Sequence, residues 1–342
     1  MSVPQTTSEL DEIQSQPRDN TVTALSDLPG DIVVLGAGGK MGPTLARMAH
    51  RALQESPSPN RRVIAVSRFS DATVEQSLRD SGIETIACDL LNADAVALLP
   101  DAPSVVYLAG RKFGTENDSQ ETWRQNVAVP TVCVEHYAGS RIVVFSSGNV
   151  YPLVPHTSGG STESDPTDPV GTYAMSCVGR EGVFEFASRT RGTPVTIMRL
   201  NYAIDLHHGV LTDLAIKIVG RDPIPLSMGY INIIWQRDAN RAALELLAHA
   251  QSPPLIVNVT GPEILSVRDL ARRLGKRLHR EPLFEGEEED NALLSDTSRM
   301  HALLGPSEMD IETMLDWVAD WVGDGRPVLD RPTHFETRDG SF

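Results

Sequence analysis

Short runs of apolar, β-type residues alternate with helix-like stretches over residues 31–200. The runs are Ile32–Leu35, Val63–Val66, Ser104–Leu108, Arg141–Phe145 and Pro194–Met198, and the stretches between them include Pro43–Gln54, Ala72–Ser81 and Thr122–Tyr137. Continuous apolar runs are typical of strands buried on both faces. Parallel strands need long crossover connections, which helices supply. The pattern therefore predicts an α/β fold with a doubly wound parallel sheet.

A glycine-rich turn follows the first of these runs. It reads Gly36-Ala37-Gly38-Gly39-Lys40-Met41-Gly42 and leads directly into a helix-like stretch. Glycine allows a tight turn and a close approach of the backbone to a pyrophosphate, and the start of a helix offers amide donors. With a strand before it and a helix after it, the motif predicts a Rossmann-type dinucleotide site. The phosphate-binding residues would be Gly36, Gly38, Gly39, Lys40, Met41 and Gly42.

The end of the second run indicates which dinucleotide is bound. An NAD site usually carries Asp or Glu there, whereas an NADP site carries a basic group for the 2′-phosphate. This chain has Ser67-Arg68, which could donate to a phosphate and pair with it, and Lys40 could add a second positive charge. The sequence thus favours NADP over NAD, unless Arg68 is an ordinary solvated charge.

Composition excludes several other classes of function. The chain has 30 Lys and Arg against 46 Asp and Glu, a net charge of −16, which disfavours a general binder of nucleic acid or of anionic membranes. No apolar run approaches the roughly 20 residues of a membrane span. The three cysteines form no CxxC pair and no His has metal-ligand spacing, so we expect no metal site. We therefore expect a soluble, cytoplasmic protein.

The pattern changes after Asn201, where loops and short apolar segments replace the regular alternation. The predicted elements there are a segment over Gly229–Trp235, a helix from Asp238 to about His249, a strand over Leu255–Val259, a helix with Ser266 as its N-cap, and a closing helix over Ile311–Val322. The predicted organisation is a disordered leader over residues 1–28, a dinucleotide-binding domain over 29–200, a mainly substrate-binding part over 201–330 with some segments returning to the first domain, and a tail over 331–342.

Further segments resemble one family when they are taken together with the glycine motif. They are Cys88-Asp89-Leu90, Tyr107-Leu108-Ala109-Gly110, Asn126-Val127, Phe145–Pro152, Asp168–Cys177 and Arg199–Tyr202. Over about residues 31–325 the chain resembles the extended short-chain dehydrogenase/reductase family, in its NAD(P)-dependent epimerase/dehydratase group. The resemblance implies that the cofactor is contacted by Asp89, Leu90, Leu108, Ala109, Gly110, Asn126 and Tyr173.

The resemblance also implies a catalytic pair. Tyr173 matches the family's acid/base, and Ser147 matches the serine that holds the substrate oxygen. The family places a lysine four residues after the tyrosine, one helical turn away, where its charge makes the phenol a stronger acid. Here that position is Cys177, which cannot supply the charge.

Three interpretations of this departure are open. Another cation could occupy the space, with Lys112 as the first candidate and Arg111 and Arg180 behind it. The enzyme could be slow, or could use the tyrosine only as an acid. Alternatively, the chain could bind a dinucleotide without turnover, as a catalytically weak or inactive regulatory or sensor protein.

Several other residues could have a functional role or an ordinary structural one. Cys177 could be a nucleophile, His207 and His208 could contact a ligand, and the loop His156–Glu163 could be a lid, while Trp235 and Asp238 read as structural. Lys217, Arg221, Arg272 and Arg273 could serve a nucleotide sugar but show no diagnostic arrangement. The favoured function is NAD(P)-dependent oxidoreduction or epimerisation of a sugar-like or hydroxy-carbonyl small molecule. The family also implies a homodimer through residues 122–137 and 173–188.

Overall fold

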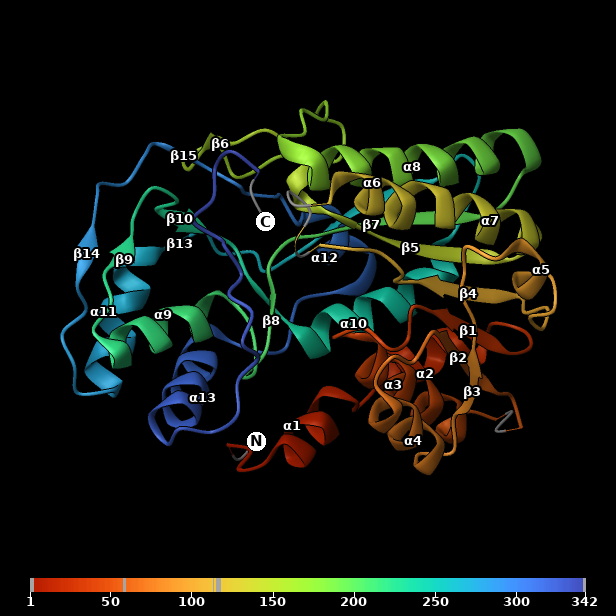
Figure 1. Ribbon diagram of the computed structural model, residues 1–342, viewed down its shortest axis with the longest axis horizontal. Helices are drawn as coiled ribbons and strands as arrows, with labels where there is room; N and C mark the ends of the chain where they lie inside the picture. The colour runs from red at the N-terminus through yellow and green to blue at the C-terminus, as the bar shows by residue number, and fades with distance from the viewer. Residues whose placement is uncertain (1–2, 58–59, 113, 115–117, 341–342) are drawn as a thin grey trace.

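The computed structural model describes residues 3–57, 60–112, 114 and 118–340. Within these residues, seven strands form one parallel sheet in the order β3-β2-β1-β4-β5-β7-β12 (Figure 1). The strands are β1 (Ile32–Leu35), β2 (Val63–Ser67), β3 (Glu84–Ala87), β4 (Ser104–Tyr107), β5 (Arg141–Ser147), β7 (Val195–Leu200) and β12 (Leu255–Val259). The chain builds the sheet outward from β1 in both directions, so the prediction of a doubly wound parallel sheet is confirmed.

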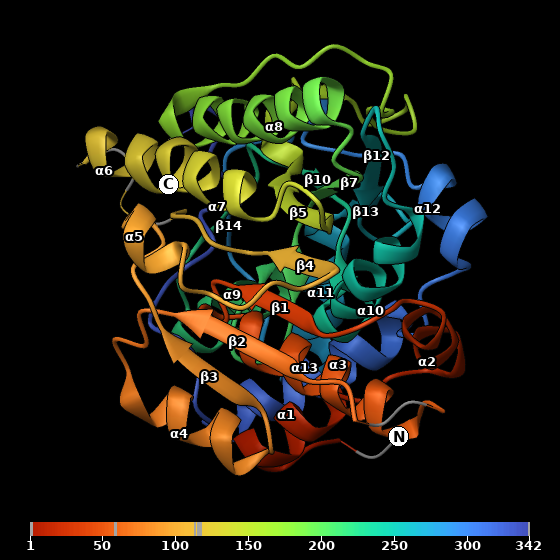
Figure 2. The ribbon, with the colours of Figure 1, turned by 90° about the vertical axis from the view of Figure 1, so that its right-hand side faces the viewer.

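Both faces of the sheet are covered, as the apolar runs require. In β1, Ile32 and Val34 pack into one core, whereas Val33 and Leu35 pack into the core on the opposite face. Helices lie above and below the sheet in Figure 2. One face carries α2 (Asp19–Ser26), α3 (Gly42–Glu55), α4 (Ala72–Asp80), α10 (Gln236–Glu245) and α12 (Ser298–Leu304), and the other carries α5 (Ala93–Val96), α7 (Val129–His136) and α8 (Gly171–Arg191).

Two elements of this domain differ from the sequence-based expectation. The single helix expected over residues 122–137 is divided into α6 (Ser119–Trp123), a π-helical turn (Arg124–Ala128) and α7. Pro130 lacks the amide that would bond to the Asn126 carbonyl in an α-helix, which explains the irregular turn before it. Strand β3 was not predicted, because it is a half-exposed edge strand and not an apolar run.

Much of the chain after residue 200 packs around a second core, whereas α10, β12 and α12 return to the sheet domain. This second core forms around α9 (Val210–Gly220), α11 (Val267–Arg277) and α13 (Ile311–Gly323). Ser266 caps α11 as predicted, since its side chain accepts from the amide of Asp269. Short strand pairs complete this part: β6 (Val154–Pro155) with β15 (Asn291–Ala292), β8 (Ala203–Ile204) with β11 (Ile234–Trp235), β9 (Ile224–Pro225) with β14 (Phe284–Glu285), and β10 (Tyr230–Ile231) with β13 (Leu265–Ser266). Two 3-10 turns lie at Gly148–Val150 and Leu246–His249.

The N-terminal segment is ordered, so the prediction of a disordered leader over residues 1–28 is wrong for its described residues. It forms α1 (Thr7–Gln14) and α2, whose Leu10 and Leu25 are fully buried. Leu10 joins the core of the second part, and Leu25 joins the core beneath the sheet. Arg18 forms a bidentate ion pair with the buried Glu245. Residues 1–2 lie outside the described residues.

The C-terminal residues also pack closely on the molecule. We name residues 326–340 the C-terminal strap; it runs from α13 to the start of α8, near the C mark in Figure 1. Phe335 is buried in the second core, and Arg338 donates to the carbonyls of Ser227 and Asn291. The predicted tail over 331–342 is therefore part of the fold over its described residues, and 341–342 lie outside them.

Candidate active site

Two adjoining cavities lie along the carboxyl ends of the central strands. They share Gly36, Gly39, Leu108 and Gly110, so together they form one elongated space. This position is the one where doubly wound sheets bind dinucleotides, because the strand order reverses between β1 and β4.

The glycine turn is built for a close approach. Gly36 has φ +89°, and a Cβ there would lie 2.5 Å from the Ala109 nitrogen. A Cβ at Gly42 would collide with the Ala37 carbonyl where α3 begins. At Gly39 the nearest atom would be 3.4 Å away, so the missing side chain leaves open space where the two cavities join. The turn thus fits the pyrophosphate of a dinucleotide.

One cavity, of about 320 Å³, has the features of an adenosine site. Its wall contains the predicted residues Gly36, Gly38, Gly39, Ser67, Arg68, Asp89, Leu90, Leu108, Ala109 and Gly110. It also contains Asp71, which the sequence analysis missed because it lies four residues beyond Ser67 and caps α4. Two hydrogen bonds from Thr73 lower the pKa of Asp71. The adenosine end therefore holds a carboxylate as well as the Arg68 cation.

Lys40 does not lie at the adenosine end. Its ammonium is 3.2 Å from Asp205 and lines the second cavity together with Met41. Lys40 therefore does not line the cavity that contains Ser67 and Arg68, and its contact with a 2′-phosphate stays a prediction. A long side chain can leave its own loop, and here Asp205, far away in the sequence, decides its direction.

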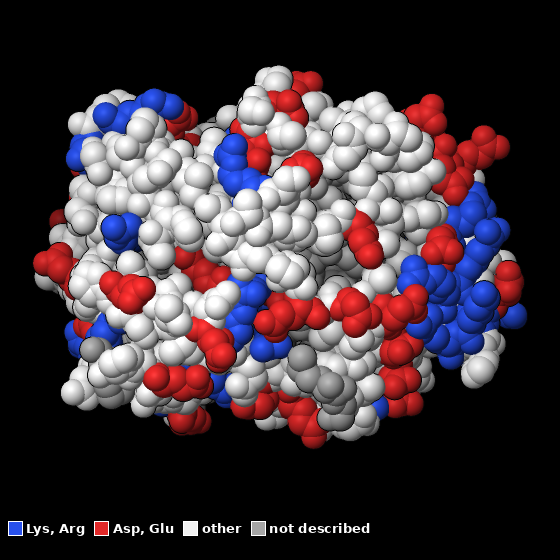
Figure 3. Space-filling model, turned by 180° about the vertical axis from the view of Figure 1, so that it is seen from behind, with Lys and Arg blue, Asp and Glu red and all other residues white. Residues whose placement is uncertain are grey.

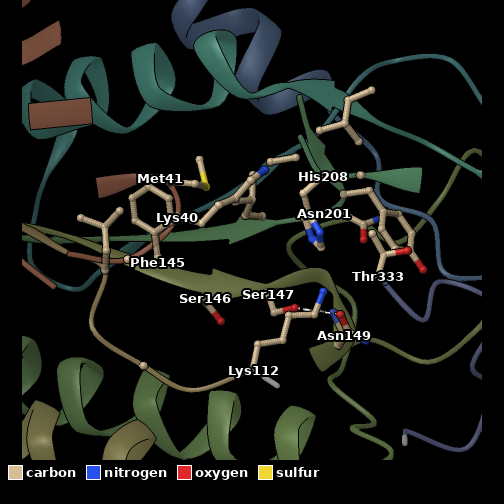
Figure 4. Close-up of a pocket in the computed structure, with 18 of the residues that line it drawn as sticks. Lys40, Met41, Lys112, Phe145, Ser146, Ser147, Asn149, Asn201, His208 and Thr333 are labelled. Carbon is tan, nitrogen blue, oxygen red and sulfur yellow. Dashed lines mark hydrogen bonds between the residues drawn. The ribbon is translucent and has the colours of Figure 1, made fainter. Parts of the chain in front are cut away.

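The second cavity, of about 380 Å³, brings the predicted catalytic residues together. Tyr173 from the first turn of α8, Ser147 from the end of β5, and Lys112 from the loop after β4 all line it. Figure 4 shows Lys112 reaching toward Ser147 and Asn149. The Ser147 hydroxyl donates to Asn149 Oδ1 at 2.9 Å and accepts from the Asn149 amide at 3.2 Å, which fixes the serine side chain.

The protonation of Tyr173 reflects a buried site. Burial raises its pKa well above the ordinary value, and Cys177 raises it further. Arg180 and a hydrogen bond with Ser147 act in the opposite direction but do not overcome burial. Tyr173 is therefore a neutral phenol at neutral pH and a weaker acid than an exposed tyrosine.

Cys177 packs in a small apolar group with Val150 and Tyr151 and is fully buried. It lines neither cavity. Burial raises the pKa of its thiol, so it stays neutral. Both observations oppose a role as a nucleophile, because nucleophilic cysteines need an accessible thiolate.

Lys112 lines the same cavity as Tyr173 and Ser147. Burial and the charge of Lys40 lower its pKa, Cys177 and Asp213 act in the opposite direction, and the result is a pKa of about 8. Lys112 and Lys40 also lower the pKa of His208, which lies across the same cavity (Figure 4). A lysine with a pKa near 8 can hold or release a proton close to physiological pH.

Asn126 holds the loop that carries Lys112. Its side chain accepts from the Arg111 amide at 2.7 Å and donates to the Arg111 carbonyl at 2.9 Å. Arg180 donates to Asn126 at 2.5 Å and to the Phe145 carbonyl at 2.8 Å. Asn126 lines neither cavity, so the structure gives it a positioning role in place of the predicted cofactor contact.

Of the other residues singled out in the sequence, some line the second cavity and others have structural contacts elsewhere. His208 lines the catalytic cavity, whereas His207 contacts Thr7 and Trp321. The loop over residues 156–163 does not line the cavity, so it is not a lid there; Ser161 binds the Leu294 and Asp296 backbone. Buried Asp238 caps the amides of Glu308 and Met309, a structural role as expected. Residues missed by the sequence analysis are Asn149, Asn201, Arg331 and Thr333 in the cavity wall.

The basic residues considered for a nucleotide sugar lie elsewhere. Arg272 and Arg273 line a surface hollow with Lys276 and Arg280, where Lys and Arg gather at one end of the molecule (Figure 3). Arg273 also pairs with Glu312 of α13. Neither these residues nor Lys217 and Arg221 line the two cavities.

A comparison with protein families supplies the classification. The sequence profile of the NAD dependent epimerase/dehydratase family matches residues 32–221, more than half of the chain. The chain belongs to this family. Members are enzymes that use a nicotinamide dinucleotide, so an enzyme role follows for this family member. No curated protein sequence matches the chain.

Solved structures of family enzymes share the fold. The UDP-glucuronic acid 4-epimerase of Bacillus cereus, solved with NAD, is 18% identical, with a TM-score of 0.72 over 86% of this chain and 99% of that one. The dTDP-glucose 4,6-dehydratase of Streptomyces venezuelae, solved with NAD, is 20% identical, with a TM-score of 0.73 over 86% and 97%. The UDP-glucose 4-epimerase of Thermotoga maritima is 17% identical, with a TM-score of 0.70 over 86% and 99%.

The residues that the structure describes contain no helix long and apolar enough to cross a membrane. They also contain no group of three or more His, Cys, Asp or Glu placed to hold a metal ion.

Proposed function

We propose that this chain is an NAD(P)-dependent oxidoreductase or epimerase that acts on a hydroxyl- or carbonyl-bearing carbon of a small, sugar-like molecule. The observation that carries the proposal is that Tyr173, Ser147 and Lys112 line one cavity, which continues into the glycine turn. Glycines 36, 39 and 42, with Arg68 and Asp89, would hold the dinucleotide. When bound, the dinucleotide supplies the hydride acceptor or donor.

The chain's own residues supply the proton chemistry. The Ser147 hydroxyl, fixed by Asn149, holds the substrate oxygen. Tyr173 is protonated at neutral pH and donates to that oxygen when a carbonyl is reduced. The Lys112 ammonium stabilises negative charge on the same oxygen, whereas the family lysine acts on the tyrosine from the position of Cys177.

The first test separates binding from turnover. Fluorescence titration with NADPH and NADH measures dinucleotide binding, and a screen of carbonyl and hydroxyl compounds then measures turnover. Tyr173→Phe should keep dinucleotide affinity within about twofold and lower turnover at least about 100-fold, because it removes the proton donor. Tight dinucleotide binding with no turnover of any compound would instead favour the regulatory or sensor function.

The second test concerns the replacement cation. Lys112→Met should lower turnover at pH 7, and Cys177→Lys in that background should restore part of it. Lys112 is charged below about pH 8 and loses its proton above it, so wild-type turnover should fall above pH 8 while the Lys112→Met profile stays flat there. Lys217→Met, on α9 and outside the cavities, is the charge-matched control. Unchanged turnover in Lys112→Met would refute this role.

A further inference from the structure

The wall of the catalytic cavity is cationic in a chain that is strongly acidic overall. Lys40, Lys112, His208 and Arg331 line it, and none of the described lining residues is Asp or Glu. The whole chain carries a net charge of −16. The four basic residues come from four separate segments, so their convergence is a property of the fold and not of one basic stretch.

The nearby carboxylates are already engaged outside the cavity wall. Asp205 pairs with Lys40 and accepts from the amides of His207 and His208 at 2.8 Å. Asp213 accepts from the Thr333 amide at 2.8 Å and from its hydroxyl at 2.6 Å. The basic side chains therefore line the cavity, whereas the carboxylates of Asp205 and Asp213 lie outside its wall.

Burial, together with the charges of Lys40 and Lys112, lowers the pKa of His208 to about 4. His208 is therefore neutral near pH 7, and the positive charge of the cavity wall comes from Lys40, Lys112 and Arg331. Like charges in a buried site repel one another, and an anion between them would relieve that repulsion. The arrangement suits an anionic ligand better than a neutral one.

The C-terminal strap limits the size of that ligand. It contributes Arg331 and Thr333 to the cavity wall. It is held on both sides of that point, because the Leu329 amide donates to the His207 carbonyl and Tyr202 donates to the Phe335 carbonyl. The cavity of about 380 Å³ must also hold the reactive end of the dinucleotide. The remaining space suits a compact molecule and not one with a nucleoside diphosphate.

We propose that the substrate is a small polyhydroxylated carboxylate, of the sugar-acid class, whose carboxylate is bound by Arg331 and Lys40. This inference rests on the proposed function for the identity of the reacting carbon. The assignment of the carboxylate-binding residues does not depend on that function. Arginine binds carboxylates through its planar fork. Asn201 and Thr333, which line the same cavity, would bind hydroxyl groups. Phosphorylated sugars share the anionic chemistry and are distinguished by the test.

The test measures binding by isothermal titration, with and without saturating NADP⁺ or NAD⁺. The probes are gluconate and galacturonate, the neutral sugars glucose and galactose, glucose 6-phosphate, and UDP-glucose. We expect a sugar acid to bind at least about tenfold more tightly than the matching neutral sugar, as one charge-assisted pair provides. Arg331→Gln should remove most of that preference, and Lys40→Met part of it. Arg189→Gln on α8, which makes the same charge change far from the cavity, should preserve it.

Each other outcome overturns a defined step. Equal binding of acids and neutral sugars overturns the anion site, and so does an unchanged preference in Arg331→Gln. Tighter binding of UDP-glucose overturns the size limit, and tighter binding of glucose 6-phosphate overturns the carboxylate assignment. Failure of both dinucleotides to bind overturns the proposed function separately, because the anion preference is also measured without them.

Discussion

At the scale of single residues, Arg68 and Asp71 have opposite effects on the choice of dinucleotide. Both line the adenosine cavity. A guanidinium attracts the 2′-phosphate of NADP, whereas a carboxylate suits the free 2′-hydroxyl of NAD. Asp71 is engaged by Thr73, so we propose that Arg68 allows NADP to bind while Asp71 keeps NAD acceptable.

Arg68→Ala should therefore weaken NADPH binding about tenfold and change NADH binding by no more than about twofold, since a charge-assisted contact is lost only with NADP. Fluorescence titration of both dinucleotides measures the ratio. Arg79→Ala, on α4 outside the cavity, controls for the charge change. A parallel loss for both dinucleotides would show that Arg68 does not contact the 2′-phosphate.

Single residues also show which parts of the candidate site could be predicted from the sequence. The glycines were predicted from their spacing between a strand and a helix, whereas Tyr173 and Ser147 were predicted from the family resemblance. The contacts of Lys40 and Asn126 could not be predicted, because the three-dimensional fold brings their partners, Asp205 and Arg111, to them. Arg331 carried no motif at all, and only the path of the strap brings it to the cavity.

At the scale of elements, the two N-terminal helices differ most from the sequence-based prediction. Each has eight residues, about two turns, which is too short for a helical apolar period to show. One signal was present: Thr6 and Glu9 have capping-box spacing, and in the structure Thr6 accepts from Glu9 while Glu9 accepts from Gln5. The strands were easier to predict, because both of their faces are buried.

Leu25→Ala in α2 should lower the free energy of unfolding by about 2–5 kcal/mol, as is usual when a fully buried leucine leaves a cavity. Urea denaturation followed by circular dichroism measures this change. Thr23→Ala, at an exposed position of the same helix, should change it by about 0.5 kcal/mol or less. Equal stability of Leu25→Ala and wild type would mean that α2 does not stabilise the sheet domain.

At the scale of the whole molecule, apolar side chains remain exposed on one outer layer. Trp123 of α6 is 42% exposed, and Met175 and Phe186 of α8 are 49% and 63% exposed. Helices α6, α7 and α8 lie side by side above the sheet (Figure 2). We propose that this layer forms the homodimer interface expected from the family resemblance.

Phe186→Glu should then shift the protein toward monomers, because a charge cannot be buried there without a partner. Sedimentation velocity over a range of concentrations measures the change. Leu98→Glu, at an exposed apolar position in the turn after α5, should leave the association unchanged. A monomeric wild type at high concentration would refute the interface.

The contact between the two ends of the described chain bears on how the protein is made. Arg326 donates to the Pro4 carbonyl, and α1 lies against His207 through Thr7. Arg331 reaches the catalytic cavity only when the strap is in place. During synthesis the amino-terminal residues leave the ribosome first and begin to fold before the rest exists. A nascent chain can therefore begin to assemble its dinucleotide groove before the strap, which completes the wall of the second cavity, has been synthesised.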